Sequence, residues 1–171
     1  MTLENKLGLT SSADLAREEE RISKKKAAEL FEKGILDNLP AGKFSTLQAI
    51  HKYLFEDICD FAGELRTVNI AKGNFRFAPL MYLQAALDNI DKMPQSNFDE
   101  IVEKYVEMNI AHPFREGNGR TQRVFLSQLA HHAGYVIDFT RVDPDDLMIA
   151  TIQAAGGVDD FLMVLFDEMV V

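Results

Sequence analysis

The chain has 171 residues, 47% of them hydrophobic and 26% charged, a balance typical of one soluble globular domain with a real core. Its formal net charge of −9 argues against direct nucleic-acid binding, because phosphate backbones attract basic surfaces. The single cysteine, Cys59, cannot form an internal disulfide; we expect a small buried side chain in a reducing compartment. No signal sequence or membrane-spanning run is visible, so a cytoplasmic protein with no membrane partner is expected.

The first part of the chain has the pattern of helices. Ser11-Ser12 and the acidic residues after it predict a helix start, and this helical region extends to about Glu32. Gly34–Lys43 reads as a loop, and Ser45–Gln48 has the pattern of a capping box. His51 lies beside the apolar stripe that follows, and we expect it to be a neutral core or boundary residue, not a ligand. The stripe at helical spacing consists of Leu47, Ile50, Leu54 and Ile58.

A short β-hairpin is predicted for Arg66–Ala78, because residues alternate with period two on both sides of the turn-forming Lys72-Gly73-Asn74. The fold class is therefore predicted to be all-α, a helical bundle of about eight helices with one small hairpin in a single domain. The helical segments predicted after the hairpin are Pro79–Lys92, Phe98–Ala111, Asn118–Ala133, Pro144–Ala154 and Val158–Met169. Asp143 before Pro144 is a good N-cap, and Gly156-Gly157 a good break between the last two segments.

Residues suited to bind an anion lie where two of these helices are joined. Gly117-Asn118-Gly119 precedes a helix, so backbone N–H groups and the partial positive charge of the helix N-terminus favour an anion there. Arg120 and Arg123 are three residues apart and can share one helix face. Two guanidinium groups beside such a site suit a polyphosphate better than a single carboxylate.

Two further residues of this segment suggest chemistry. Glu116 suits a hard divalent cation, since Mg²⁺ takes one or two carboxylates together with phosphate oxygens and water. His112, at the end of the preceding helix, can accept a proton from a hydroxyl near neutral pH. A base, a metal ligand, an anion site and an arginine pair together indicate phosphoryl or nucleotidyl transfer.

Each of these residues also has a structural interpretation. A Gly-x-Gly sequence is usually a turn, and this one lacks the Lys-Ser/Thr of a P-loop. His112 suits a structural hydrogen bond at a helix end, and Asn118 suits a helix cap. His131 and His132 point to different helix faces, so we expect boundary residues and no metal pair. The residues taken alone leave the catalytic and structural interpretations open.

The segment resembles the signature of the Fic domain family, H-x-F-x-[D/E]-G-N-G-R-x-x-R. Eight specified positions within twelve residues are all present: His112, Phe114, Glu116, Gly117, Asn118, Gly119, Arg120 and Arg123. The resemblance extends over nearly the whole chain. Residues 45–171 are similar to the family core, with the flap at 66–78 and the motif at 112–123, and residues 1–44 look like the N-terminal helical extension of stand-alone bacterial Fic toxins.

The resemblance implies a protein adenylyltransferase, which passes AMP from ATP to a hydroxyl of a target protein and releases pyrophosphate. It implies that His112 is the general base and that Glu116 holds Mg²⁺ between the α- and β-phosphates. Phe114 is expected to pack the loop into the core. Arg115 occupies an unspecified position, and we expect of it only solubility or target contact.

The same resemblance implies how the triphosphate is bound. Gly117, Asn118 and Gly119 would form the anion hole for the α-phosphate. Arg120 would bind the β-phosphate, and Arg123 would reach the γ-phosphate. Glycine at position 119, where family members that phosphorylate carry lysine, favours AMP transfer over phosphate transfer.

The flap is expected to bind the target backbone as an added strand. Lys72, Gly73 and Asn74 at its tip are the expected target-docking residues, although the same three residues suit an ordinary hairpin turn. DNA gyrase and topoisomerase IV subunits are the first expected targets from the resemblance, and a host protein is the alternative if the chain is a secreted effector. Transfer of another nucleotide or phosphodiester group, and a non-catalytic helical interaction module, are the other functions considered.

Many Fic proteins restrain themselves through a helix with the motif [S/T]-x-x-x-E-[G/N], whose glutamate pairs with the arginine equivalent to Arg123. The Glu-Gly and Glu-Asn pairs of this chain are Glu4-Asn5 and Glu116-Gly117, and neither completes that motif. We therefore expect a toxin-type Fic protein that is inhibited by a separate small antitoxin.

Overall fold

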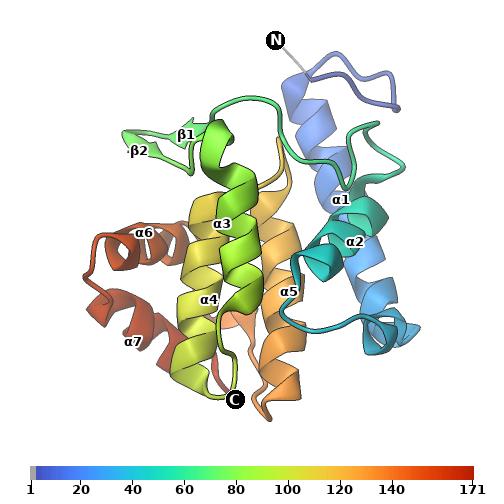
Figure 1. Cartoon of the computed structure of the whole chain (residues 1–171). Helices are drawn as coiled ribbons and strands as arrows, with labels where there is room; N and C mark the ends of the chain where they lie inside the picture. Colours follow the sequence, from blue (N-terminus) through green and yellow to red (C-terminus); the bar gives the residue numbers. More distant parts are fainter. Residues whose placement is uncertain (1–2) are drawn as a thin grey trace.

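The computed structural model describes residues 3–171, and it confirms an all-α fold with a small hairpin (Figure 1). The α-helices of the described residues are α1 Ser12–Glu32, α2 Phe44–Phe55, α3 Leu80–Lys92, α4 Phe98–Ala111, α5 Asn118–His132, α6 Pro144–Ala155 and α7 Asp160–Met169. Two 3₁₀ helices, η1 Ile35–Asn38 and η2 Phe139–Arg141, complete the helical elements of this part of the chain. None of the helices within residues 3–171 is long and apolar enough to cross a membrane.

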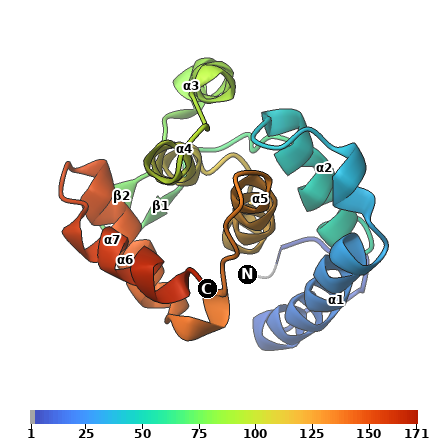
Figure 2. The same cartoon turned by 90° about the horizontal axis from the view of Figure 1, so that it is seen from below.

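Helix α5 occupies the centre of the molecule (Figure 2). It packs against α2 on one side and α4 on the other, and α3 covers the outer face of α4. Helices α1 and α2 pack together at one side of α5, whereas α6 and α7 pack together at the opposite side, against α4. The predicted apolar stripe of α5 explains this position, because Val124, Phe125 and Leu129 are all buried in the core.

The hairpin is shorter than the alternating pattern of residues 66–78 predicts. Its strands are β1 Ala71–Lys72 and β2 Phe75–Arg76, joined by Gly73 and Asn74. The antiparallel pairs are Ala71 with Arg76 and Lys72 with Phe75. One more backbone bond, from the Phe77 N–H to the Ile70 carbonyl at 3.2 Å, continues the pairing. Farther from the turn, Arg66 contacts the chain around His112 and does not extend the ladder.

One predicted helix start is wrong, and a long-range contact explains why. Helix α2 begins at Phe44 after the N-cap residue Lys43, and Ser45 lies inside the helix. The Asp91 carboxylate from the end of α3 accepts a hydrogen bond from the Phe44 backbone N–H at 2.7 Å. A distant side chain therefore caps this helix in place of the local capping box.

Other local signals are confirmed. The Ser11 hydroxyl accepts a hydrogen bond from the Asp14 N–H at the start of α1, and the Asp143 carboxylate accepts from two N–H groups at the start of α6. Gly156 ends α6 as predicted. Cys59 is buried, and this burial raises the pKa of its thiol to about 11, as suits a small core side chain.

Candidate functional site

The candidate site surrounds the loop between α4 and α5. His112 ends α4 in the left-handed conformation, with φ 46°, and is the only non-glycine residue with positive φ among residues 3–171. A left-handed backbone costs an L-residue about 1 kcal/mol or more, so the surrounding contacts must hold it. The imidazole stacks on the Phe77 ring at 3.7 Å between centroids and 10° between planes.

Hydrogen bonding sets the tautomer of His112. Its Nδ1 lies 3.2 Å from the Asn109 carbonyl oxygen, which can only accept, so Nδ1 carries the hydrogen. The neutral imidazole then has its free lone pair on Nε2. Burial lowers the pKa of His112 to about 4, and the positive charges of Arg66 and Lys72 act in the same direction. His112 is therefore neutral at pH 7 and able to accept a proton.

Arg66 is buried at the base of the flap and joins it to the end of α4, a role that the sequence patterns do not reveal. Its guanidinium donates only to backbone carbonyls, and no carboxylate pairs with it within residues 3–171. The acceptors are His112 O at 2.8 Å, Val68 O at 2.8 Å, Ala111 O at 3.1 Å and Ala78 O. A cation at the C-terminal end of a helix is also favoured by the helix dipole. Arg66 thus fixes the backbone of His112.

His51 supports the loop from the side of α2. Its Nδ1 accepts from the Gly63 N–H at 2.8 Å, so Nε2 carries the hydrogen and donates to the Glu116 carbonyl at 2.8 Å. The ring is fully buried and stacks on Phe114 at 3.9 Å between centroids. Burial lowers the pKa of His51 to about 4, so the predicted neutral, satisfied core histidine is confirmed.

The start of α5 forms the other side of the loop. Gly117 has φ 80°, and a Cβ added there would lie 2.5 Å from two carbons of the Phe55 ring. The Asn118 amide accepts from the Phe114 N–H at 2.9 Å and donates to the Phe114 carbonyl at 2.6 Å, which closes the loop. Phe114 is fully buried, as expected. The first N–H groups of α5 have no partner within the helix and are available to an anion.

A cavity of about 680 Å³ lies in front of this loop, between the flap, α1, α5 and the start of α6. Seven of the eight motif residues line it: His112, Glu116, Gly117, Asn118, Gly119, Arg120 and Arg123. The eighth, Phe114, is buried behind the loop. Lys72 of the flap also lines it, whereas Gly73 and Asn74 form the exposed turn outside the lining. The structure thus brings the motif together with one of the three predicted flap residues.

Some charged side chains of the cavity have an ion-pair partner among the described residues, whereas others have none. The Arg123 side chain has no ion-pair partner within residues 3–171, and burial and the neighbouring Arg120 lower its pKa. An arginine still remains charged at neutral pH. The Glu116 carboxylate is half exposed and lies 4.0 Å from Arg115, which lines the cavity although no binding role was expected of it.

Helix α1 adds a carboxylate that the motif does not contain. Glu19 lines the cavity, and burial together with the nearby Glu116 carboxylate raises its pKa. No group of three or more histidine, cysteine or acidic residues within residues 3–171 could hold a metal by itself. This donor set fits Mg²⁺, which needs only one or two carboxylates when phosphate oxygens and water complete its shell.

The sequence model of the Fic/DOC family matches residues 43–130, which contain the loop, the flap and both arginines. The chain belongs to the Fic/DOC family. The protein adenylyltransferase VbhT of Bartonella schoenbuchensis is 34% identical over 174 residues, which cover 94% of this chain and 35% of VbhT. The chain therefore spans about a third of the length of that relative.

Two further Fic proteins match over most of their length. The "Probable protein adenylyltransferase Fic" of Salmonella typhimurium is 30% identical over 98% of this chain and 87% of its own sequence. The N-terminal Fic domain of a VirB-translocated Bep effector from Bartonella quintana, solved with bound ADP, has a TM-score of 0.82 and 25% identity. This similarity covers 99% of our chain and 91% of that chain. The Fic fold inferred from the motif is thereby confirmed.

Proposed function

We propose that this chain is a protein adenylyltransferase, which transfers AMP from ATP to a Tyr, Ser or Thr hydroxyl of a target protein. The observation that carries the proposal is the state of His112. Its Nδ1–H is engaged by Asn109, its ring is held by Phe77, and its neutral Nε2 is left to accept a proton at a cavity that two arginines line. The names of the Fic relatives and the ADP-bound Bep structure support the same chemistry.

In the proposed reaction, His112 accepts the proton of the target hydroxyl. The target hydroxyl oxygen forms a bond to the α-phosphorus while the bond from that phosphorus to the α–β bridging oxygen breaks. The hydroxyl proton moves to His112 Nε2, and pyrophosphate leaves. Because the pKa of His112 is lowered to about 4, the imidazole is in its base form at physiological pH.

The remaining motif residues have the following proposed roles. The backbone at Gly117, Asn118 and Gly119 binds the α-phosphate, Arg120 the β-phosphate and Arg123 the γ-phosphate. Helix N-termini and arginine pairs stabilise phosphate charge in this way. A Cβ at position 119 would lie in ordinary contact with the Arg123 side chain, 3.6 Å from its Nη1.

A magnesium ion is the cofactor proposed with ATP. Glu116 would hold it, because its carboxylate is half exposed at the cavity and beside the loop. When bound, Mg²⁺ would supply positive charge that stabilises the phosphates of ATP. Glu19 is the second acidic side chain at the cavity wall.

Target docking is proposed for the flap. Both residues of β1, Ala71 and Lys72, are exposed, and the sheet of the described residues ends at this strand, so its outer backbone groups can pair with an extended segment. Lys72 lines the cavity, which places β1 beside His112. Gly73 and Asn74 at the turn would contact the target outside the cavity.

Regulation by a separate small antitoxin is proposed on the basis of the unpaired Arg123. Arg123 forms no ion pair among residues 3–171, so it could pair with a glutamate supplied by a partner chain. Type II topoisomerase subunits, DNA gyrase and topoisomerase IV, are the proposed targets, with cytoplasmic action. The Bep relatives are VirB-translocated effectors, and this observation favours a secreted effector acting on a host protein as the second candidate function.

The testing experiment combines the purified protein with α-labelled ATP, Mg²⁺ and either a gyrase or topoisomerase IV subunit or a cell lysate. Mass spectrometry of labelled protein then reports both the transferred group and the modified residue. We expect AMP on a hydroxyl side chain, lost in His112→Ala and retained in His132→Ala, whose histidine is exposed at the far end of α5. Label arriving from γ-labelled ATP, or preference for another nucleoside triphosphate in competition, would contradict adenylylation.

A further inference from the structure

Helix α1 contacts the arginine to which we assign the β-phosphate. The Nη1 group of Arg120 donates to the Ser23 hydroxyl oxygen and to the Glu19 carbonyl oxygen, the latter at 3.3 Å. Ser23 lies 97 residues before Arg120 in the chain and is fully buried. Neither the motif nor the family-model match at residues 43–130 includes α1.

The hydroxyl of Ser23 is oriented by its own helix. Its O–H donates to the Glu19 carbonyl one turn earlier, so the oxygen lone pairs remain for Arg120. A serine hydroxyl has one hydrogen to donate, and this bond uses it. Ser23 can therefore act toward Arg120 only as an acceptor, which is the role that a guanidinium requires.

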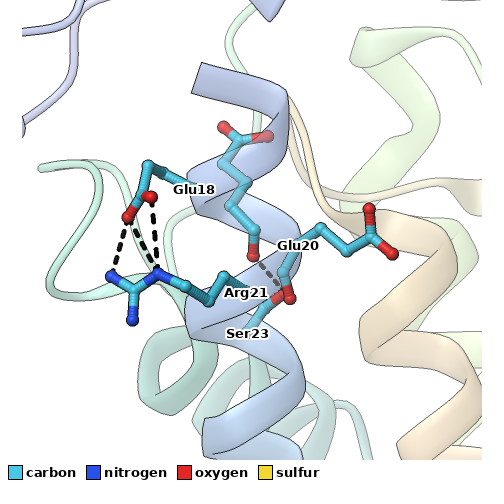
Figure 3. Close-up of polar contacts among 5 residues, drawn as sticks. Glu18, Glu20, Arg21 and Ser23 are labelled. Carbon is cyan, nitrogen blue, oxygen red and sulfur yellow. Dashed lines mark hydrogen bonds and ion pairs between the residues drawn. The ribbon is translucent and has the colours of Figure 1, made fainter. Parts of the chain in front are cut away.

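The two groups that hold Arg120 are uncharged, and this matters for phosphate binding. On the same helix, Arg21 pairs with the Glu18 carboxylate at 2.7 Å, so its charge is compensated by its partner (Figure 3). Arg120 forms no ion pair within residues 3–171, and the Glu19 carboxylate interacts with it only through charge attraction, without a direct bond. A hydroxyl and a carbonyl fix the direction of its guanidinium and leave its charge available to an anion.

We propose that Ser23 is a positioning residue for Arg120, so that α1 is a working part of the nucleotide site. This inference rests on the proposed function, in which Arg120 binds the β-phosphate. Ser23 itself is buried and does not line the cavity. Its removal leaves Arg120 free to adopt other rotamers, and binding of ATP must then order the side chain again.

The test is a double-mutant cycle on ATP affinity, measured by calorimetry with Mg²⁺ in a His112→Ala background so that bound ATP is not consumed. We expect Ser23→Ala to weaken ATP binding about five- to tenfold, which corresponds to roughly 1.0–1.4 kcal/mol. In the Arg120→Ala background the same substitution should have no further effect, whereas in Arg123→Ala it should keep its effect. Ser127→Ala is the matched control, because Ser127 makes the same type of bond to the carbonyl four residues earlier and does not line the cavity.

Several results would overturn the inference. ATP affinity that is unchanged in Ser23→Ala while Arg120→Ala weakens it would show that Ser23 does not position the arginine. An effect of Ser23→Ala that persists in Arg120→Ala would assign the loss to the packing of α1. If Arg120→Ala itself leaves ATP affinity unchanged, the role of Arg120 in the proposed function is wrong, and the inference is overturned with it. In the active protein, Ser23→Ala should raise KM for ATP and change kcat less than twofold.

Discussion

Acid should destabilise this protein through His112, and the size of the effect follows from its surroundings. The pKa of His112 is lowered to about 4 from an ordinary value of 6.5, mainly by burial. Between these values the unfolded chain binds a proton that the folded protein excludes, so the free energy of unfolding falls as pH falls below about 6.5. At pH 5.0, the difference relative to pH 7.5 amounts to about 2 kcal/mol for this group.

The perturbation that isolates this effect is His112→Asn. Asparagine is the substitution of choice, since it tolerates the left-handed backbone that His112 adopts at φ 46°. His51, whose pKa is also lowered to about 4, remains in both proteins and contributes equally to their acid sensitivity. Glu19, whose raised pKa acts in the opposite direction, is likewise present in both.

The assay is urea unfolding followed by circular dichroism at pH 7.5 and 5.0. We expect wild type to lose about 2 kcal/mol more stability than His112→Asn over this interval, or about 4–8 °C more in Tm. Only the difference in pH dependence is interpreted, because the substitution also removes the stack on Phe77. Equal losses in the two proteins would refute the argument that the buried imidazole is held neutral.

Two substitutions test the supports of the loop. Arg66→Lys should lower kcat for AMP transfer at least tenfold and change KM for ATP little. A single ammonium cannot reach the four backbone carbonyls that accept from the Arg66 guanidinium. Steady-state kinetics measures both constants, and Arg76→Lys, on the exposed flap, is the control. Gly117→Ala should lower the free energy of unfolding by about 1–2 kcal/mol for the left-handed backbone, and further because the added methyl would lie 2.5 Å from the Phe55 ring. Gly134 is also left-handed but has no heavy atom within 4 Å of an added Cβ, so Gly134→Ala should show the backbone cost alone. Denaturant unfolding measures both.

Local sequence patterns were sufficient for most of the fold. The apolar spacing of Val124, Phe125 and Leu129 correctly predicted a buried face on α5, and Asp143-Pro144 correctly predicted the start of α6. The motif residues of the cavity are likewise predictable from the sequence, because their spacing is local and family-specific. In each case the information lies within a few residues of the feature that it determines.

What the sequence could not predict are contacts between distant segments. Asp91 caps α2 from the end of α3, and the local pattern at Ser45 therefore misplaced the helix start. Arg66 looked like one residue of an alternating strand, yet it is buried against carbonyls of the α4 terminus. The sequence around Arg66 carries no signal of its burial, because the partners of its guanidinium are backbone oxygens.

The N-terminal segment 1–44 was the least informative part of the sequence, and its described residues are integral to the domain. Leu30 and Leu36 are buried in the same core as α5. The Gln128 side chain of α5 donates to the carbonyls of Leu36 and Leu39 at 2.8 and 2.9 Å. Removal of this segment would expose apolar core and leave a buried amide without acceptors, at a cost of several kcal/mol. The contact from Ser23 to the nucleotide cavity is thus made by a helix that the fold already requires.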